Sequence, residues 1–301
     1  MNQFILRKEI SVAGRLFRTA KLRHEWCEFL QDAPRAIIEM RKARLNADLF
    51  AFVHDLCDQP REYSYQRLSI GLAVLPVITY DRWWDEIGYK TRNKLRKGLK
   101  SGVELRLAVL DDDFARGVAA IYNETPLKQG RRFYHYGKKA QEVKEELSSF
   151  TEQSTLVGAY FEDRLVGFMK LFQGNNVLRT VHIIASVGHR DKNIMDILIA
   201  KGVELCSERK IQNLHYGSWT GGGVGTFRIK HGFQRVEVPR FFVPLSLRGQ
   251  LMLRLKLHLP ARERLPESWI APAIGLRTKW NSFRFGCLRA AGINDHRSAV
   301  E

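Results

Sequence analysis

The segment that decides the fold spans residues 182–198 and reads HIIASVGHRDKNIMDIL. Its start continues a β-branched run and predicts a strand over 177–186. A polar turn follows over 187–193, and apolar residues at helical spacing then predict a helix over 192–209. A turn that leads into a helix offers free backbone N–H groups and the positive end of the helix dipole, so this segment is typical of an anion-binding site.

The residues around this segment alternate between strand and helix patterns. Before it, strands over 155–161 and 165–172 flank the tight polar turn Glu162-Asp163-Arg164. After it we expect, in order, a strand over 211–219, a glycine loop over 221–225, a short helix over 226–231 and a final strand or pair of strands over 233–245.

The part of the chain before residue 124 is less regular. We expect a hairpin of 4–12 with 15–19 around Ala13-Gly14, a helix over 35–45, strands over 70–75 and 77–80, a short helix capped by Asp81, a basic helix over 90–102, a strand over 103–109 and a helix over 114–123.

This order of elements resembles the core of the GNAT superfamily of acyltransferases, over roughly 152–245. The segment 182–198 resembles the family's phosphate-binding turn and main helix, and 227–233 its short helix before a Gly-Phe pair. The resemblance implies that the donor binds at Ile184, Ser186, His189, Arg190, Lys192 and Asn193, and that backbone N–H groups of 184–187 stabilise an oxyanion. The alternative is that 189–193 is only a polar helix cap.

Two departures from the family pattern concern coenzyme A. Asn193 and Met195 stand where the family has glycines that let a pyrophosphate approach the backbone. Arg228 stands where many members have a tyrosine that protonates the leaving thiolate, and a guanidinium is a poor general acid. Both departures disfavour an ordinary acetyl-CoA enzyme.

The segment 83–103, with its Trp83-Trp84 pair and basic helix, resembles the FemAB-like branch. Relatives in that branch move an amino acid from aminoacyl-tRNA onto a peptidoglycan precursor. The alternative is a basic helix on a solvated face. We predict an α/β fold with a GNAT-like mixed sheet flanked by helices and a reduced second GNAT-like unit at the N-terminus. The predicted boundaries are 1–110 for the abbreviated unit, 111–245 for the acyltransferase domain and 246–301 for a basic C-terminal tail.

The polar and aromatic loop 125–139 lies where GNAT-like enzymes line the acceptor groove. We expect it to bind the acceptor, with His135 as the general base because imidazole titrates near neutral pH. The alternative is an exposed turn whose aromatic rings pack on the core. Tyr216 is a second candidate catalytic residue at the end of a strand next to the expected cleft. The predicted substrate-binding residues are Arg92, Arg131, Arg132, Tyr134, Tyr136, Lys138 and Ser218.

Composition limits the remaining possibilities. The net charge of +17 favours polyanionic partners such as tRNA, and the leucine-rich basic stretch 244–258 either packs on the domain or lies on an anionic membrane. The four cysteines form no CxxC pair and the histidines have no metal-ligand spacing, so we expect no metal. Residues 1–9 lack the apolar run of a signal peptide, and we expect a cytoplasmic protein, either free or peripheral at the inner face of the membrane.

The favoured function is transfer of an acyl or aminoacyl group to an amine. The donor is expected to be a substrate, acyl-CoA or aminoacyl-tRNA, and no cofactor is expected to bind tightly. Two alternatives stay open: an ordinary acetyl-CoA-dependent N-acetyltransferase, and a basic protein without enzymatic activity that binds nucleic acid or a membrane surface.

Overall fold

The computed structural model describes residues 3–57, 62–128, 131–259, 280 and 283, and its contacts divide the chain into two units. Among the described residues, the first unit contains those within 1–88, 172–181 and 203–260, and the second those within 89–171, 182–202 and 261–301. The division interleaves the sequence, so the linear boundaries at residues 110 and 245 stay a prediction. Most of the predicted tail 246–301 lies outside the described residues.

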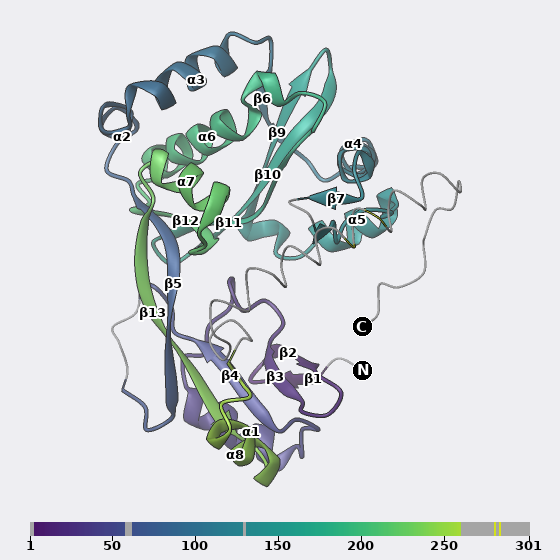
Figure 1. The fold of residues 1–301 in the computed structure, drawn as a ribbon, viewed down its shortest axis with the longest axis vertical. Coiled ribbons are helices and arrows are strands. Elements are labelled where there is room, and N and C mark those ends of the chain that lie inside the picture. The colour runs from purple at the N-terminus through teal and green to yellow at the C-terminus, as the bar shows by residue number, and fades with distance from the viewer. Residues whose placement is uncertain (1–2, 58–61, 129–130, 260–279, 281–282, 284–301) are drawn as a thin grey trace. The chain divides into compact units, whose positions relative to one another are not determined.

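The first unit is a mixed sheet with helices (Figure 1). Its strand order is β1-β2-β3-β4-β13-β5-β12-β11, in which β3 with β4 and β11 with β12 are parallel. The long strands β5 and β13 run antiparallel side by side. The elements are β1 (Gln3–Ile5), β2 (Lys8–Ala13), β3 (Thr19–Leu22), α1 (Ala33–Lys42), β4 (Leu49–Val53), β5 (Gln66–Pro76), α2 (Tyr80–Glu86), β12 (Asn213–Ser218), α7 (Gly222–Lys230), β13 (Gln234–Pro244) and α8 (Leu247–Arg254).

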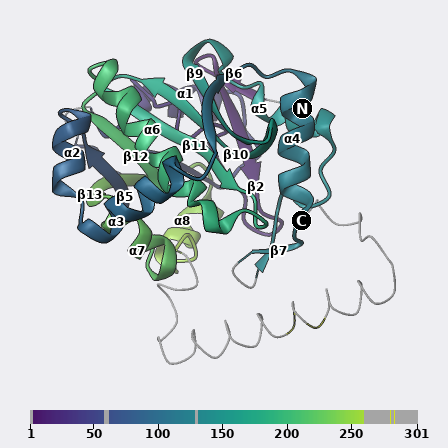
Figure 2. The same ribbon diagram turned by 90° about the horizontal axis from the view of Figure 1, so that it is seen from above.

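The second unit has the strand order β11-β10-β9-β6, and its helices α4 and α5 pack side by side (Figure 2). Its own elements are α3 (Tyr89–Leu99), β6 (Glu104–Ala108), α4 (Asp112–Asn123), β7 (Leu127–Lys128), β8 (Arg131–Arg132), α5 (Ala140–Leu147), η1 (Thr151–Gln153), β9 (Ser154–Phe161) and η2 (Arg190–Lys192). Three further elements contribute residues to both units: β10 (Arg164–Gly174), β11 (Val177–Ala185) and α6 (Ile194–Glu208).

Local chemistry explains where these elements begin and end. The Asp111 carboxylate accepts a 2.7 Å hydrogen bond from the amide of Phe114 and caps α4, as the aspartate run predicts. Glu162 and Asp163 both have positive φ, 50° and 57°, which is the geometry of a tight hairpin turn between β9 and β10. The mixed α/β class, this hairpin, α6 and the strands β11, β12 and β13 are confirmed.

Several local predictions are wrong. The first strand is broken at Leu6 and Arg7, which have positive φ, so β1 pairs with β2. Strand β2 pairs with β3, which begins only at Thr19, the last residue of the predicted partner 15–19. Residues 77–80 do not form a strand, because β5 ends at Pro76 and Thr79 caps α2 in place of Asp81.

Two helices also differ from the predictions. The glycine run is not a loop throughout, since α7 already begins at Gly222. Helix α5 was not predicted. It buries only Val143 and Leu147, so its apolar stripe is short.

Candidate functional site

Five polar or aromatic side chains of the second unit meet around His135, and we call them the histidine cluster. Tyr122 comes from α4, His135 and Lys138 from the loop before α5, Glu146 from α5 and His182 from β11. The Glu146 carboxylate lies 2.7 Å from Nζ of Lys138 and 3.4 Å from Nδ1 of His135. The His135 ring lies 4.4 Å from the Tyr122 ring and 4.8 Å from that of His182, and the Tyr122 hydroxyl lies 3.1 Å from Nε2 of His182.

Burial and charge set the protonation states in this cluster. Burial, with further repulsion from His135, lowers the pKa of His182 to about 3, so its ring is neutral at neutral pH. Burial opposes ionisation of Glu146, but hydrogen bonds from His135 and Lys138 outweigh it and lower the pKa of Glu146 to about 2. Burial raises the pKa of Tyr122, which keeps its proton. The Glu146 carboxylate beside His135 is therefore ionised at neutral pH.

This arrangement suits proton transfer by His135. Its side chain keeps 15% exposure, and Nδ1 lies 3.4 Å from the Glu146 carboxylate and 3.2 Å from Nζ of Lys138. Contacts of a carboxylate and an ammonium with one ring nitrogen hold the imidazole in place, which leaves the other nitrogen, Nε2, for proton exchange. His135 can therefore act as a base for a group that approaches Nε2.

The other residues predicted in the acceptor loop differ in their exposure and contacts. Tyr134 is 73% exposed and carries Lys138 over its ring, with Nζ 4.4 Å from the ring centre. Arg131 and Arg132 form the exposed strand β8, and Tyr136 is half-buried. The structure thus brings Tyr134, His135 and Lys138 into contact.

The turn after β11, in the second unit, is closed by a carboxylate. Glu124, which follows α4, accepts a 2.6 Å hydrogen bond from the Ser186 hydroxyl and a short one from the amide of Val187. His189 Nδ1 lies 2.9 Å from the same hydroxyl, and the amide of Ser186 donates to the carbonyl of Val166. The amides of Ser186 and Val187 both donate to acceptors of the protein in this structure, and the oxyanion role of 184–187 stays a prediction.

The remaining donor-binding candidates lie along the same turn. Ile184 is buried in the core beside Phe168, which leaves its side chain a packing role. Arg190 and Lys192 form η2, and Asn193 follows with φ 51°. Nζ of Lys192 lies 3.6 Å from the centre of the Phe161 ring.

Tyr216 and Ser218 belong to β12 in the first unit. The Arg228 guanidinium lies over the Tyr216 ring at 4.6 Å, and its Nη1 donates a 2.6 Å hydrogen bond to the carbonyl of Ser218. Burial raises the pKa of Tyr216, which disfavours it as an acid near neutral pH. Arg92 lies on α3 in the second unit.

Sequence reasoning did not find Tyr122, His182, Glu146 or Glu124. Glu124 lies 62 residues from Ser186, and Tyr122 lies 60 residues from His182. No local spacing marks such pairs, because the fold alone brings them together.

Comparison with solved structures shows which known folds this chain is similar to. The chain has a TM-score of 0.57 and 13% identity to the C-terminal domain of a candidate lysylphosphatidylglycerol synthetase from Agrobacterium fabrum, with 84% of this chain and 86% of that one covered. For L-PGS from Bacillus licheniformis the TM-score is 0.54 at 14% identity, with 90% of this chain and 86% of that one covered. For FemX the TM-score is 0.54 at 9% identity, with 82% of this chain and 86% of that one covered. No family model and no curated protein sequence matches the chain. The predicted mixed α/β fold class, a mixed sheet flanked by helices, is confirmed.

Two further observations concern membrane-spanning helices and metal sites. Within the described part of the chain, no helix combines the length and the apolar character needed to cross a membrane. The same described residues contain no group of three or more His, Cys, Asp or Glu side chains arranged to hold a metal ion.

Proposed function

We propose that the protein transfers an aminoacyl or other acyl group from an activated ester to an amine, with aminoacyl-tRNA as the favoured donor. The fold is similar to FemX and to a candidate lysylphosphatidylglycerol synthetase domain, and FemAB-like enzymes use such donors. A cell-envelope precursor is the acceptor that this likeness favours. The net charge of +17 suits a polyanionic donor.

The observation that carries the choice of donor is the Glu124 carboxylate on Ser186 and Val187. It occupies the turn that would receive the pyrophosphate of coenzyme A. A pyrophosphate would have to displace this carboxylate or accept its repulsion at close range, and either costs binding energy. An ester donor without a pyrophosphate at this position meets no such obstacle.

His135 is the proposed general base, and Glu146 is a positioning residue that acts through it. The acceptor nitrogen bonds to the carbonyl carbon of the donor, and the bond from that carbon to the ester oxygen breaks. Nε2 of His135 takes the amine proton and returns it to the leaving oxygen. An amine attacks an activated ester directly, so the reaction needs no covalent enzyme intermediate.

Thermal unfolding with different donors tests the choice. A ligand that binds only the folded protein raises Tm with its concentration. We expect aminoacylated tRNA to raise Tm more than the deacylated pool, and acetyl-CoA and free CoA to have no effect on the native protein. In Glu124→Gln the turn loses its charge, and we expect CoA to raise Tm. A Tm rise of the native protein with an acyl-CoA would restore the N-acetyltransferase alternative.

A second candidate is binding of a polyanion without catalysis, which the charge of +17 favours. Such binding weakens steeply with salt and does not depend on an acyl group. Equal Tm shifts with charged and deacylated tRNA, abolished together by salt, would support this candidate over transfer.

A further inference from the structure

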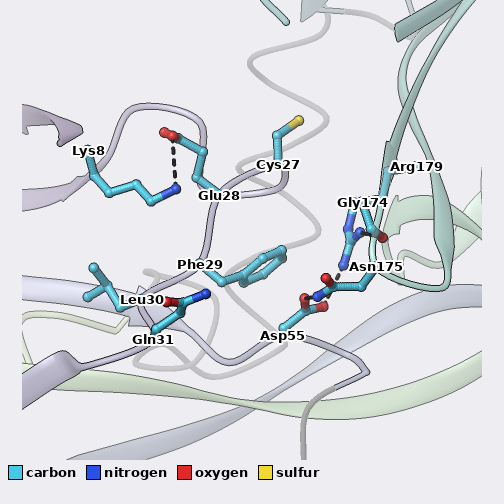
Figure 3. A pocket seen from close by; sticks show the side chains of 10 residues that line it. All are labelled: Lys8, Cys27, Glu28, Phe29, Leu30, Gln31, Asp55, Gly174, Asn175 and Arg179. Carbon is cyan, nitrogen blue, oxygen red and sulfur yellow. Dashed lines mark hydrogen bonds and ion pairs between the residues drawn. The ribbon is translucent and has the colours of Figure 1, made fainter. Parts of the chain in front are cut away.

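The first unit contains a cavity of about 420 Å³ outside the second unit's histidine cluster. The loop that follows β3, the end of β4 and the turn between β10 and β11 form its walls. Figure 3 shows two charged groups on different sides of the lining. The first is Asp55 with Asn175 and Arg179, the second is Lys8 with Glu28, and the Phe29 ring lies between them.

The first charged group is a fixed, buried ion pair. Arg179 Nη2 donates to the Asp55 carboxylate at 2.5 Å, and the two side chains are 4% and 1% exposed. Asn175 Nδ2 donates to the other carboxylate oxygen at 2.5 Å, and the Phe29 ring lies 4.9 Å from the guanidinium. Because each charge is paired and hydrogen-bonded, this side of the cavity is rigid and electrically neutral.

The second charged group is an exchangeable pair. Nζ of Lys8 lies 3.2 Å from the Glu28 carboxylate, and these side chains keep 32% and 15% exposure. An ion pair that solvent reaches contributes little, because water screens it and two long side chains must be held in place. A ligand can therefore separate the two groups at small cost and take each as a partner.

The positive and negative side chains that line the cavity balance, so its net charge is zero. This favours a ligand that carries no net charge. A ligand with net charge would leave that charge uncompensated in a half-enclosed site, whereas a zwitterion adds none. We propose that this cavity binds a free amino acid: its ammonium bonds to Glu28, its carboxylate bonds to Lys8, and its side chain lies against Phe29. The volume falls in the range of small-molecule sites. This binding goes beyond the transfer reaction and does not depend on it.

Calorimetric titration of the full chain with single amino acids tests the site, with no donor present. We expect saturable binding of at least one amino acid below about 10 mM. Its N-acetyl derivative lacks the ammonium and its methyl ester lacks the carboxylate, so each should bind at least about tenfold more weakly. Equal affinity for either derivative, or no binding by any amino acid, would overturn the proposal.

Two variants assign the partners, and two others serve as controls. Glu28→Gln and Lys8→Met should each weaken binding at least about tenfold, because each removes one charged partner of the zwitterion. Glu39→Gln and Lys42→Met change a similar but more exposed ion pair on α1 of the same unit, 3.7 Å apart, and should bind as the native protein does. Unchanged affinity in both Glu28→Gln and Lys8→Met, with unchanged Tm, would exclude this site.

Discussion

The Glu124 carboxylate accepts a 2.6 Å hydrogen bond from the Ser186 hydroxyl, at the turn for which the sequence predicts anion binding. Its second oxygen accepts a hydrogen bond from the amide of Val187. Nδ1 of His189 lies within hydrogen-bond distance of the same Ser186 hydroxyl. A side chain of the protein thus supplies the anion that this turn is built to bind. This contact is the basis of the proposed preference for a donor without a pyrophosphate.

Removing the Glu124 carboxylate should destabilise the second unit. In Glu124→Ala the buried Ser186 hydroxyl and the amide of Val187 lose their acceptor, which costs about 1–3 kcal/mol of unfolding free energy. Denaturant unfolding measures this cost. The exposed Glu152 gives a control, since Glu152→Ala should change stability by no more than about 0.5 kcal/mol. Equal effects of the two changes would mean that the Glu124 contacts contribute nothing.

The transfer rate should depend on His135 and Glu146. We expect His135→Gln to lower kcat by about 10²–10⁴-fold, the usual contribution of a general base. Glu146→Gln should lower kcat less and leave KM nearly unchanged, because Glu146 orients His135 and does not bind substrate. Steady-state kinetics at saturating donor measure both values.

A neighbour on α5 and a conservative change provide the controls. Glu145 is bonded by Gln141 on the same helix, so Glu145→Gln should keep the native kcat. Glu146→Asp retains the charge and should recover part of the rate. If Glu145→Gln and Glu146→Gln are equally slow, the effect of Glu146 is structural and not exerted through His135.

His215 should make the protein sensitive to mild acid. Burial, with repulsion from Arg179 and Arg228, lowers the pKa of His215 from 6.5 to about 3. Below pH 6.5 the His215 side chain is protonated in the unfolded chain but not in the folded chain. As the pH falls, the unfolding free energy therefore decreases by about 1.4 kcal/mol per pH unit for this group. Unfolding free energies of native protein and His215→Phe, measured between pH 7 and pH 5, test this.

His215→Phe should lose less stability across this interval than the native protein, whereas the two curves should run parallel above pH 7. The interval lies above the range in which Glu146 titrates, because the pKa of Glu146 is lowered to about 2. Identical slopes for the two proteins would show that His215 titrates normally in the folded state.

The sequence was sufficient to predict the elements around 182–198, because their apolar periodicity and turn residues are local signals. It also singled out His135, from a loop too polar and aromatic for a simple connection. It could not supply Glu146 or Glu124, whose roles depend on contacts between separate elements. The α7 start at Gly222 was missed because glycine normally predicts a loop, and tertiary context overrode that preference.

Gly98 on the basic helix α3 should resist substitution. A Cβ at this position would lie 2.7 Å from Cγ2 of Ile197 and 3.1 Å from the carbonyl of Lys192. Gly98→Ala gains up to about 1 kcal/mol in helix propensity, but the overpacking costs about 1–3 kcal/mol. We expect a net loss of stability, measured by denaturant unfolding.

Gly223 on α7 is the matched control. A Cβ there would have no heavy atom within 4 Å, so Gly223→Ala should stabilise by up to about 1 kcal/mol. If both alanines stabilise the protein, α3 is not held against α6 at Gly98.

The central claim is that an aminoacyl ester donates to an amine under the control of His135. The most direct measurement is the transfer of labelled amino acid from a charged tRNA pool to a cell-envelope extract, compared between native protein and His135→Gln. We predict a labelled, alkali-stable amide product with the native protein and a rate about 10²–10⁴-fold lower with His135→Gln. Transfer from acetyl-CoA with none from charged tRNA, or equal rates for the two proteins, would contradict the account.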